Sequence, residues 1–212
     1  MKKIKACILY IIRFIARMLS VLVYLLRPFL LVCDKLWLYL YSSYYCMIIK
    51  GSDKDVLFRP LVRVFGVDNI IIGKNTVIDK HVTLYSVGHK EKSLLYIGNG
   101  VDIGEYAHIT AIKEIRICDN VLIGKNVTIT DNSHGEICLE NLNIPPKERN
   151  MYSSGAVYIG ENVWLGDKVT VLPNVRIGKN SIIGANSVVT KNIPDNVVAA
   201  GSPAKVIKHI IK

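Results

Sequence analysis

The stretch IGENVWLGDKVTVLPNVRIGKNSIIGANSVV, residues 159–189, decides the fold of this chain. An aliphatic residue recurs in it at every sixth position, and the residue two places earlier is small or branched. The aliphatic positions are Ile159, Leu165, Val171, Ile177, Ile183 and Val189. A period of six fits neither an α-helix nor an alternating β-hairpin. It is typical of a solenoid whose coil has three short sides and takes about 18 residues.

The same period extends back to about residue 70. Earlier copies are found at Ile72, Ile78, Leu84, Ile97, Ile103, Ile109, Ile117, Ile123 and Ile129. Glycine often follows the aliphatic residue, and we expect it to give a tight turn with positive φ. Each coil of a solenoid pairs only with its neighbours, so stability accumulates by stacking. Together these positions predict about five coils.

Two interruptions of the repeat indicate where function lies. A short one covers Gly88–Leu95, and a longer one runs from about residue 132 to residue 156. A solenoid extrudes its insertions as loops on one face, and binding residues concentrate in such loops. We therefore expect a repeat domain over residues 56–212 that carries one extended loop.

Residues 1–55 form a different segment, which is apolar, basic and predicted to be helical. Residues 1–50 hold eight of the 27 Lys and Arg residues and one acidic residue, within a chain of net charge +10. The polar residues recur in steps of three and four and form one stripe on a helix. They are Arg13, Arg17, Ser20, Tyr24 and Arg27. Pro28 is expected to kink or end this helix.

A wide apolar face beside a narrow basic stripe favours a helix that lies in a membrane interface. Lys2, Lys3 and Lys5 would add attraction to anionic lipids. The alternatives are a helical hairpin packed within an oligomer and, less favoured, a true span, because no run reaches the roughly 20 consecutive apolar residues that a span needs.

The remainder of the composition excludes several classes of protein. The near balance of charge outside the basic segment argues against a nucleic-acid-binding protein. The five cysteines are widely separated and include no CxxC pair, which argues against a zinc site and suits a reducing compartment. They are Cys7, Cys33, Cys46, Cys118 and Cys138.

Over about residues 70–210 the chain resembles the hexapeptide-repeat acyltransferases, nearest the galactoside and maltose acetyltransferases and the polysaccharide O-acetyltransferases. The motifs that carry the resemblance are TDNSHG (130–135), IPPKERNMYSSGAVYIG (144–160), GENVWLGDKVTVLPNVRIG (160–178) and IIGANSVVTKNIPDNVVAAGSPAKVIK (182–208). The resemblance implies a mainly β fold, a left-handed parallel β-helix, with acetyl-CoA as co-substrate and no metal. It also implies a homotrimer with sites between subunits.

The function implied by this resemblance is acetyl-CoA-dependent O-acetylation of a hydroxyl on a sugar or surface-polysaccharide intermediate. With the basic segment, it predicts a cytoplasmic enzyme that is peripheral on the inner face of the cell membrane. A sugar N-acetyltransferase and a catalytically inactive β-helix scaffold remain open as alternatives. A γ-type carbonic anhydrase is disfavoured, because the sequence has no close pair of histidines for zinc.

The catalytic residue implied by the resemblance is His134, which matches the family's general base. A neutral imidazole can take a hydroxyl proton at pH 7 and so permit direct transfer without a covalent intermediate on the enzyme. Asp131 and Asn132 are close enough in sequence to orient His134 or a sugar hydroxyl. On the acceptor side, Arg149 and Met151 match loop positions near the sugar.

The donor-site residues implied by the resemblance lie in the last third of the chain. They are Trp164, Gly166, Asp167, Ala185, Thr190, Lys191, Lys205 and Lys208. Asp167 stands where this branch can have a serine, and Lys205 and Lys208 stand where arginines would approach the nucleotide phosphates, so point charges replace bidentate contacts. The family's asparagine in the preceding coil has no clear match here, and His108 is the candidate substitute.

Overall fold

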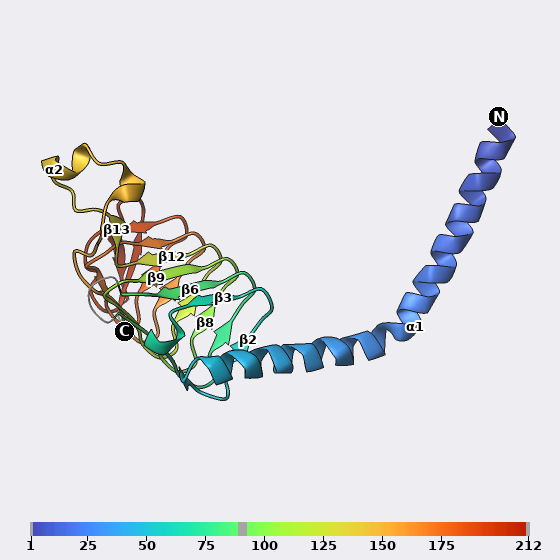
Figure 1. Ribbon diagram of the computed structural model, residues 1–212, viewed down its shortest axis with the longest axis horizontal. Coiled ribbons are helices and arrows are strands. Elements are labelled where there is room, and N and C mark those ends of the chain that lie inside the picture. Colours follow the sequence, from blue (N-terminus) through green and yellow to red (C-terminus); the bar gives the residue numbers. More distant parts are fainter. Residues whose placement is uncertain (1, 89–92, 211–212) are drawn as a thin grey trace. The chain divides into compact units, whose positions relative to one another are not determined.

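The computed structural model describes residues 2–88 and 93–210 (Figure 1). The chain divides into two compact units, Met1–Leu40 and Tyr41–Lys212. The division falls inside the long helix α1 (Lys2–Ile48), so the last turns of α1 and residues 49–55 lie with the repeat unit.

The repeat unit is built from three sheets of very short strands, and the strands within each sheet pair in parallel except for the last pair of sheet 2. Sheet 1 contains β1 (Gly51–Ser52), β4 (Ile70–Ile72), β7 (Leu94–Ile97), β10 (Glu114–Ile117), β15 (Val157–Ile159) and β18 (Arg176–Ile177). Sheet 2 contains β2 (Leu57–Phe58), β5 (Val77–Ile78), β8 (Asp102–Ile103), β11 (Leu122–Ile123), β16 (Trp164–Leu165), β19 (Ile182–Ile183), β21 (Val197–Ala200) and β22 (Lys205–His209). Sheet 3 contains β3 (Arg63–Phe65), β6 (Thr83–Ser86), β9 (His108–Ala111), β12 (Thr128–Thr130), β17 (Thr170–Val171) and β20 (Val188–Val189).

Successive strands visit the three sheets in turn, which makes the coils of a parallel β-helix (Figure 1). The predicted left-handed β-helix with an extended loop is therefore confirmed. Within residues 2–88 and 93–210 there are six full coils rather than about five, because β1, β2 and β3 form a coil before residue 70. The polypeptide of this first coil lacks the aliphatic-glycine pairs that mark the others.

The core is a set of aliphatic side chains stacked from coil to coil. One such stack on sheet 1 is in continuous register and is at most 1% exposed: Ile72, Ile97, Ile117, Ile159 and Ile177. Burial of aliphatic surface is the main stabilising term here, about 25 cal/mol per Å². The six-residue period thus corresponds to one inward-pointing side chain per side of the coil.

The expectation that the repeat glycines have positive φ is wrong for the glycines at 160, 166, 178 and 184. Positive φ occurs instead two places later, at Lys168 (φ 58°) and at asparagines such as Asn162 (φ 55°) and Asn180 (φ 56°). Asparagine tolerates this region better than most residues. Glycine is needed for close approach between coils, because a Cβ on Gly160 would lie 2.7 Å from the backbone nitrogen of Lys179.

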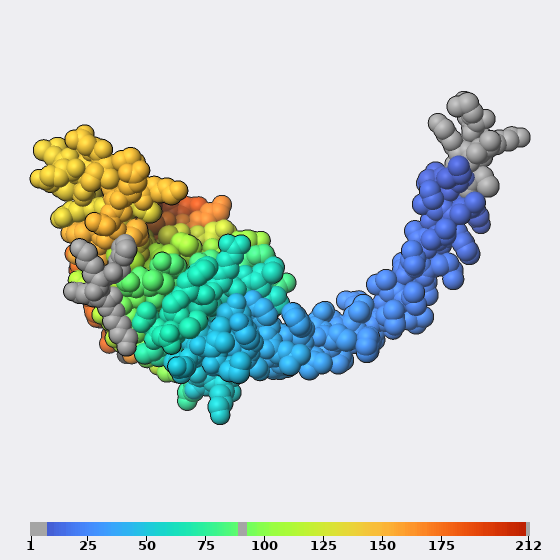
Figure 2. Space-filling view, in the orientation of Figure 1, coloured from blue at the N-terminus to red at the C-terminus, as the bar shows by residue number. Residues whose placement is uncertain are grey.

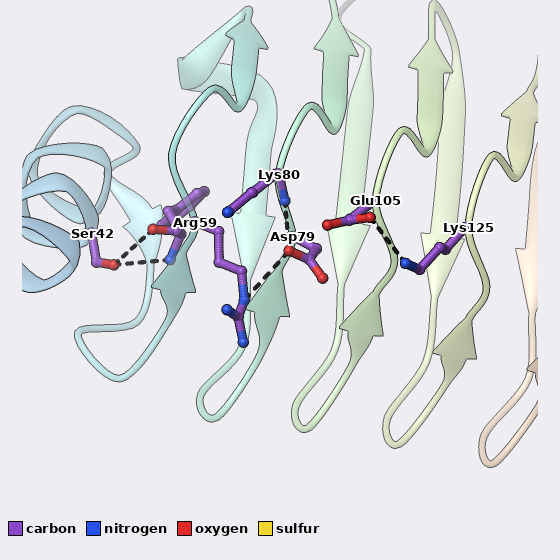
Figure 3. A network of polar contacts seen from close by, with 7 residues as sticks. Ser42, Arg59, Asp79, Lys80, Glu105 and Lys125 are labelled. Carbon is purple, nitrogen blue, oxygen red and sulfur yellow. Dashed lines mark hydrogen bonds and ion pairs between the residues drawn. The ribbon is translucent and has the colours of Figure 1, made fainter. Parts of the chain in front are cut away.

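The end of α1 covers the first coil of the repeat unit. Ser42 Oγ accepts the N–H of Phe58 at 3.0 Å and donates to the Phe58 carbonyl at 3.1 Å (Figure 3). The hydroxyls of Tyr41 and Tyr45 both donate to the Val62 carbonyl, at 3.3 and 2.8 Å, and the Tyr45 ring stacks on Phe58. Burial raises the pKa of the Tyr45 hydroxyl. These contacts satisfy backbone groups that an open sheet edge would leave unpaired.

Ion pairs link neighbouring coils on the outside of the repeat unit (Figure 3). Arg59 Nε lies 3.4 Å from Asp79 Oδ1, and Lys125 Nζ lies 3.0 Å from Glu105 Oε2. The hydrogen bond from Lys125 holds the pKa of Glu105 below its ordinary value. Because these groups are exposed, they add little to stability.

The first unit consists of α1 residues that precede Tyr41. The helix continues through Pro28 and is not ended by it, contrary to one of the two outcomes expected there. Large apolar side chains are exposed throughout this unit, from Ile8 (52%) to Leu40 (57%). The segment Ile8–Ile48 is long and apolar enough to cross a membrane, which on length and composition alone is weak evidence for a span. The side chains of Lys2, Lys3 and Lys5 lie outside the described residues.

The long interruption of the repeat lies between β12 and β15. It contains β13 (Ser133–His134), α2 (Leu139–Leu142), the 3₁₀ turn η2 (Pro146–Glu148) and β14 (Met151–Tyr152). It projects from the repeat unit as the gold-coloured lobe of Figure 2. Of the short interruption at 88–95, residues 89–92 lie outside the described residues.

Candidate active site

A groove of about 520 Å³ lies at the root of the long loop, against the outer face of sheet 3. Its walls come from four neighbouring parts of the chain: β6 with the residues after it, β9 with the residue after it, the start of the loop, and β14. The lining residues are Tyr85, Val87, Gly88, His108, Thr110, Ile112, Asn132, His134 and Met151. Three predicted site residues, Asn132, His134 and Met151, are therefore brought together.

His134 is held in this groove by a short antiparallel ribbon. It ends β13, and its partner across the ribbon is Met151 of β14. The ribbon closes the base of the loop, so both side chains are placed by main-chain pairing rather than by a free loop. The imidazole is exposed and can meet a ligand that enters the groove.

Asn132 is oriented by the preceding coil. Its Nδ2 donates to the Thr110 carbonyl at 3.0 Å and to Asp131 Oδ1 at 3.0 Å. Its backbone N–H donates to the Thr130 hydroxyl, which also exchanges a hydrogen bond with Thr110 Oγ1 at 3.1 Å. Because the amide nitrogen is occupied in this way, the amide oxygen is the polar atom left for a ligand.

Asp131 is completely buried, and its carboxylate faces the backbone of the preceding coil. It accepts the N–H groups of Ile112 at 2.9 Å, Lys113 at 2.8 Å and Glu114 at 2.8 Å. Three backbone donors on one carboxylate fix the corner between β9 and β10. The geometry therefore gives Asp131 a role in holding the groove wall rather than direct contact with His134.

His108 and Tyr85 are two of the six groove-lining residues that the predicted site set did not contain. His108 of β9 stands in register between Thr83 of β6 and Thr128 of β12, on the outward side of sheet 3. It had been considered only as a substitute for the family's asparagine. The alternation of β6 also directs Tyr85 outward, since Leu84 and Ser86 are buried. That alternation was readable in the sequence.

Arg149 lies beside the groove but not in its lining. Its Nε donates to the Ile144 carbonyl at 2.8 Å, and its aliphatic stem packs where a Cβ on Gly135 would stand. Gly135 also has a φ of +89°. Glycine is therefore favoured there both by the nearby Arg149 side chain and by the backbone conformation. Arg149 lines a separate polar hollow within the loop, with Glu136 and Glu148.

The predicted donor-site residues begin on sheet 2. Trp164 of β16 is 49% exposed and lies in register between Leu122 and Ile182. A Cβ on Gly166 would lie 2.7 Å from the Ala185 backbone nitrogen, so the coils touch at this point. The Asp167 carboxylate accepts the Lys125 N–H at 2.8 Å, which ties it to the preceding coil.

The remaining donor-site residues lie near the C-terminal end of the repeat unit. Thr190 and Lys191 follow β20, and Lys205 and Lys208 belong to β22, which pairs antiparallel with β21. All four are exposed. Of the eight predicted donor residues, none lines the His134 groove in the part of the chain that the structure describes.

No group of three or more His, Cys, Asp or Glu residues is placed to hold a metal ion among the described residues. The polar side chains that line the groove carry imidazole, amide and hydroxyl groups.

Comparison with known proteins relates part of the repeat unit to a known family of repeat proteins. Residues 156–191 match the family described as bacterial transferase hexapeptide (six repeats). The resemblance to the hexapeptide-repeat acyltransferases is thereby confirmed, and the family match itself is confined to these residues.

Among curated proteins, the chain is 44% identical over 121 residues to a putative lipopolysaccharide biosynthesis O-acetyl transferase, WbbJ, of Escherichia coli strain K12. The match covers 55% of this chain and 61% of WbbJ, so the chain spans about three fifths of that relative's length.

Two solved structures extend the comparison. A maltose O-acetyltransferase from Clostridium difficile 630 is 28% identical, with a TM-score of 0.55, over 86% of this chain and 89% of that one. A mutant of AntD, an N-acyltransferase from Bacillus cereus solved with dTDP and coenzyme A, is 24% identical. Its TM-score is 0.63 over 76% of this chain and 84% of AntD, and at this identity the likeness concerns the fold alone.

Proposed function

We propose that this protein is an acetyl-CoA-dependent O-acetyltransferase that acts on a hydroxyl of a sugar or surface-polysaccharide intermediate. The observation that carries the proposal is the groove at the loop root, in which His134, Asn132 and Met151 meet. The similarity to WbbJ and to a maltose O-acetyltransferase supports the same reaction and the same class of acceptor.

In the proposed reaction His134 is the general base. Its imidazole takes the proton of the acceptor hydroxyl, and the acceptor oxygen forms a bond to the acetyl carbon as the carbon–sulfur bond of the thioester breaks. The proton held by His134 then passes to the departing sulfur, so the base is restored. Asn132 contributes an amide oxygen toward the acceptor, and Asp131 keeps the wall beside it in place.

The donor site is proposed to comprise the residues on sheet 2 and at the C-terminal end. The exposed face of Trp164 and the backbone at Gly166, Asp167 and Ala185 would hold the arm of acetyl-CoA. Thr190, Lys191, Lys205 and Lys208 would hold its nucleotide end, because exposed ammonium groups can pair with phosphates. Since these residues do not line the His134 groove of the same chain, we further propose a homotrimer in which a neighbour completes each site.

The membrane is proposed as the location of the enzyme. The exposed apolar side chains of residues 8–40 and the basic stripe at Arg13, Arg17 and Arg27 support attachment to an anionic membrane face. Acetyl-CoA is cytosolic, so the repeat unit would work on the cytoplasmic side.

The test of the proposed function is acetyl transfer from labelled acetyl-CoA to candidate glycans by the full chain in detergent. His134→Ala is expected to lower turnover by about 10²–10⁴-fold, the range for loss of a general base. The matched control is His81→Asn. His81 has a φ of +60° and stacks on Tyr106, and asparagine occupies comparable corners such as Asn126.

Equal turnover of the His134→Ala variant and the parent chain would contradict the proposed mechanism. The acceptor atom is decided by treating the product with mild base, which removes acetate from an ester and leaves an amide intact. Retention of the acetyl group would favour the N-acetyltransferase alternative.

A further inference from the structure

The groove continues toward the N-terminal coils along one row of outward side chains on sheet 3. Strand pairing places Thr130, Thr110, Tyr85 and Phe65 opposite one another on β12, β9, β6 and β3. We call this row the strip. Neighbouring strands are about 4.8 Å apart, so the strip extends for about 14 Å over three steps.

The strip is polar at Thr130 and Thr110 and aromatic at Tyr85 and Phe65. Thr110 and Tyr85 line the groove itself, and the Phe65 ring lies 5.8 Å from the Tyr85 ring, centroid to centroid. Phe65 is 49% exposed although it is a large apolar side chain. The strip is therefore continuous with the groove and ends in an aromatic surface open to solvent.

A positive charge lies beside the outer end of the strip. Arg63 is two residues before Phe65 on β3, so both side chains lie on the outward face of sheet 3. Arg63 is exposed and has no carboxylate within ion-pair distance among residues 2–88 and 93–210. Of the other arginines on the coils, Arg59 and Arg116 are paired with acidic residues, and Arg176 lies over the Tyr158 ring.

This combination suits an acidic oligosaccharide. Aromatic rings carry a negative face that attracts the C–H groups of a sugar ring lying on it, threonine hydroxyls exchange hydrogen bonds with sugar hydroxyls, and a guanidinium pairs with a carboxylate or phosphate. An apolar partner would be poorly matched by the threonines, and a single sugar would not reach Phe65 from His134.

We propose that the strip is an extended acceptor subsite. The sugar to be acetylated occupies the groove at His134, and the following sugars of the oligosaccharide lie over Tyr85 and Phe65. An acidic group of the oligosaccharide pairs with Arg63. The proposal rests on the proposed function for the direction in which the acceptor lies, but it concerns binding and is testable without transfer.

The experiment measures binding of oligosaccharides to the full chain in detergent by isothermal titration calorimetry. The probes are galacturonate oligomers of one to three units, neutral malto-oligosaccharides of the same lengths, and maltotriose bearing a phosphate at its reducing end. We expect affinity to rise about tenfold from one to three units for the acidic series, and less for the neutral one. The phosphorylated trimer distinguishes phosphate from carboxylate as the preferred acidic group.

Two variants test whether the increase in affinity with oligosaccharide length and the preference for acidic probes depend on the strip. Phe65→Ala is expected to remove most of the increase with length, and Arg63→Gln to remove the preference for acidic over neutral probes. The matched control is Ile71→Ala, which trims an exposed apolar side chain (42%) on the outer face of sheet 1. Thermal unfolding of each variant checks that the fold is retained.

The proposal that the strip binds an acceptor would be overturned by any of three results. These are absence of binding, affinity that does not depend on oligosaccharide length, and an unchanged dependence on length in Phe65→Ala. Binding that depends on oligosaccharide length, without any acetyl transfer, would instead support the binding role of the strip and contradict the proposed function. The two proposals therefore fail separately.

Discussion

Asp131 illustrates how a residue beside a catalytic candidate contributes through the backbone. Its carboxylate is buried and accepts three backbone N–H groups from residues 112–114. Replacing it with alanine would leave those donors unpaired in the interior. Each such loss costs about 1–3 kcal/mol.

We therefore expect Asp131→Ala to reduce the free energy of unfolding by about 3 kcal/mol or more, measured by denaturant unfolding. The matched control is Asp195→Ala, since Asp195 accepts a single N–H, from Lys179 at 3.1 Å, at an exposed position. Equal losses in the two variants would contradict the structural role given to Asp131.

For single residues, the sequence allowed contacts within one loop to be predicted. His134 and Asn132 were predicted as catalytic and Met151 as acceptor-binding, and the three line one groove because they belong to the two ends of one loop. The partners of Asp131 lie about 20 residues earlier in the chain, so its contacts depend on coil-to-coil register. The direction of Arg149 depends on the fold of the loop itself, which has no repeat to predict it.

Among the elements, the turns of the coil depend on which residue lies closest to the next coil. Gly160→Ala would place a Cβ 2.7 Å from the Lys179 backbone nitrogen, and backbone cannot move aside as a side chain can. Gly184→Ala would meet the Ala200 side chain at 3.0 Å. We expect Gly160→Ala to lower stability by about 1–3 kcal/mol and Gly184→Ala by clearly less. Thermal unfolding of both variants measures the difference, and the reverse order would contradict this account of the repeat glycines.

The end of α1 predicts where the chain can be shortened. A chain beginning at Tyr41 keeps the contacts of Ser42 and Tyr45 with the first coil and is expected to be folded and soluble. A chain beginning at Gly51 loses them, together with Ile49, which is fully buried. We expect it to unfold at a lower temperature and to aggregate, as light scattering would report. Equal melting temperatures would show that the contacts contribute nothing.

The coils after residue 70 and the helical N-terminal segment were predicted correctly, and the first coil was not. The coils after residue 70 follow from the period of six, whereas the coil at residues 51–65 was missed because Phe58 and Val62 are not followed by glycine. The helix was expected to be kinked or ended at Pro28 on local grounds. It continues, and Pro28 lies inside it.

For the molecule as a whole, the prediction concerns its attachment to a membrane. The full chain is expected to sediment with anionic liposomes, and high salt to weaken this only partly, because apolar contact persists when charge is screened. Arg13→Glu with Arg17→Glu should reduce binding without changing the unfolding of the repeat unit. Lys74→Glu with Lys147→Glu is the matched control, since it makes the same change of charge in the repeat unit.

A chain that stays in the supernatant would contradict the membrane location and favour the oligomer alternative. A protease site added before Met1 distinguishes the two membrane arrangements in sealed vesicles. Cleavage from outside indicates a helix in the interface, and protection indicates a span.

The stacking of coils also fixes distances along the repeat unit. The loop that carries His134 leaves the fourth coil, and each coil adds about 4.8 Å along the stack. The height of His134 above the first coil is therefore set in equal steps by the number of coils between them. Inserting one coil between the first and the second would move His134 by one step and leave intact the groove, whose walls come from later coils. The distance between His134 and the first coil can thus be lengthened by adding repeats, without changing the side chains around His134.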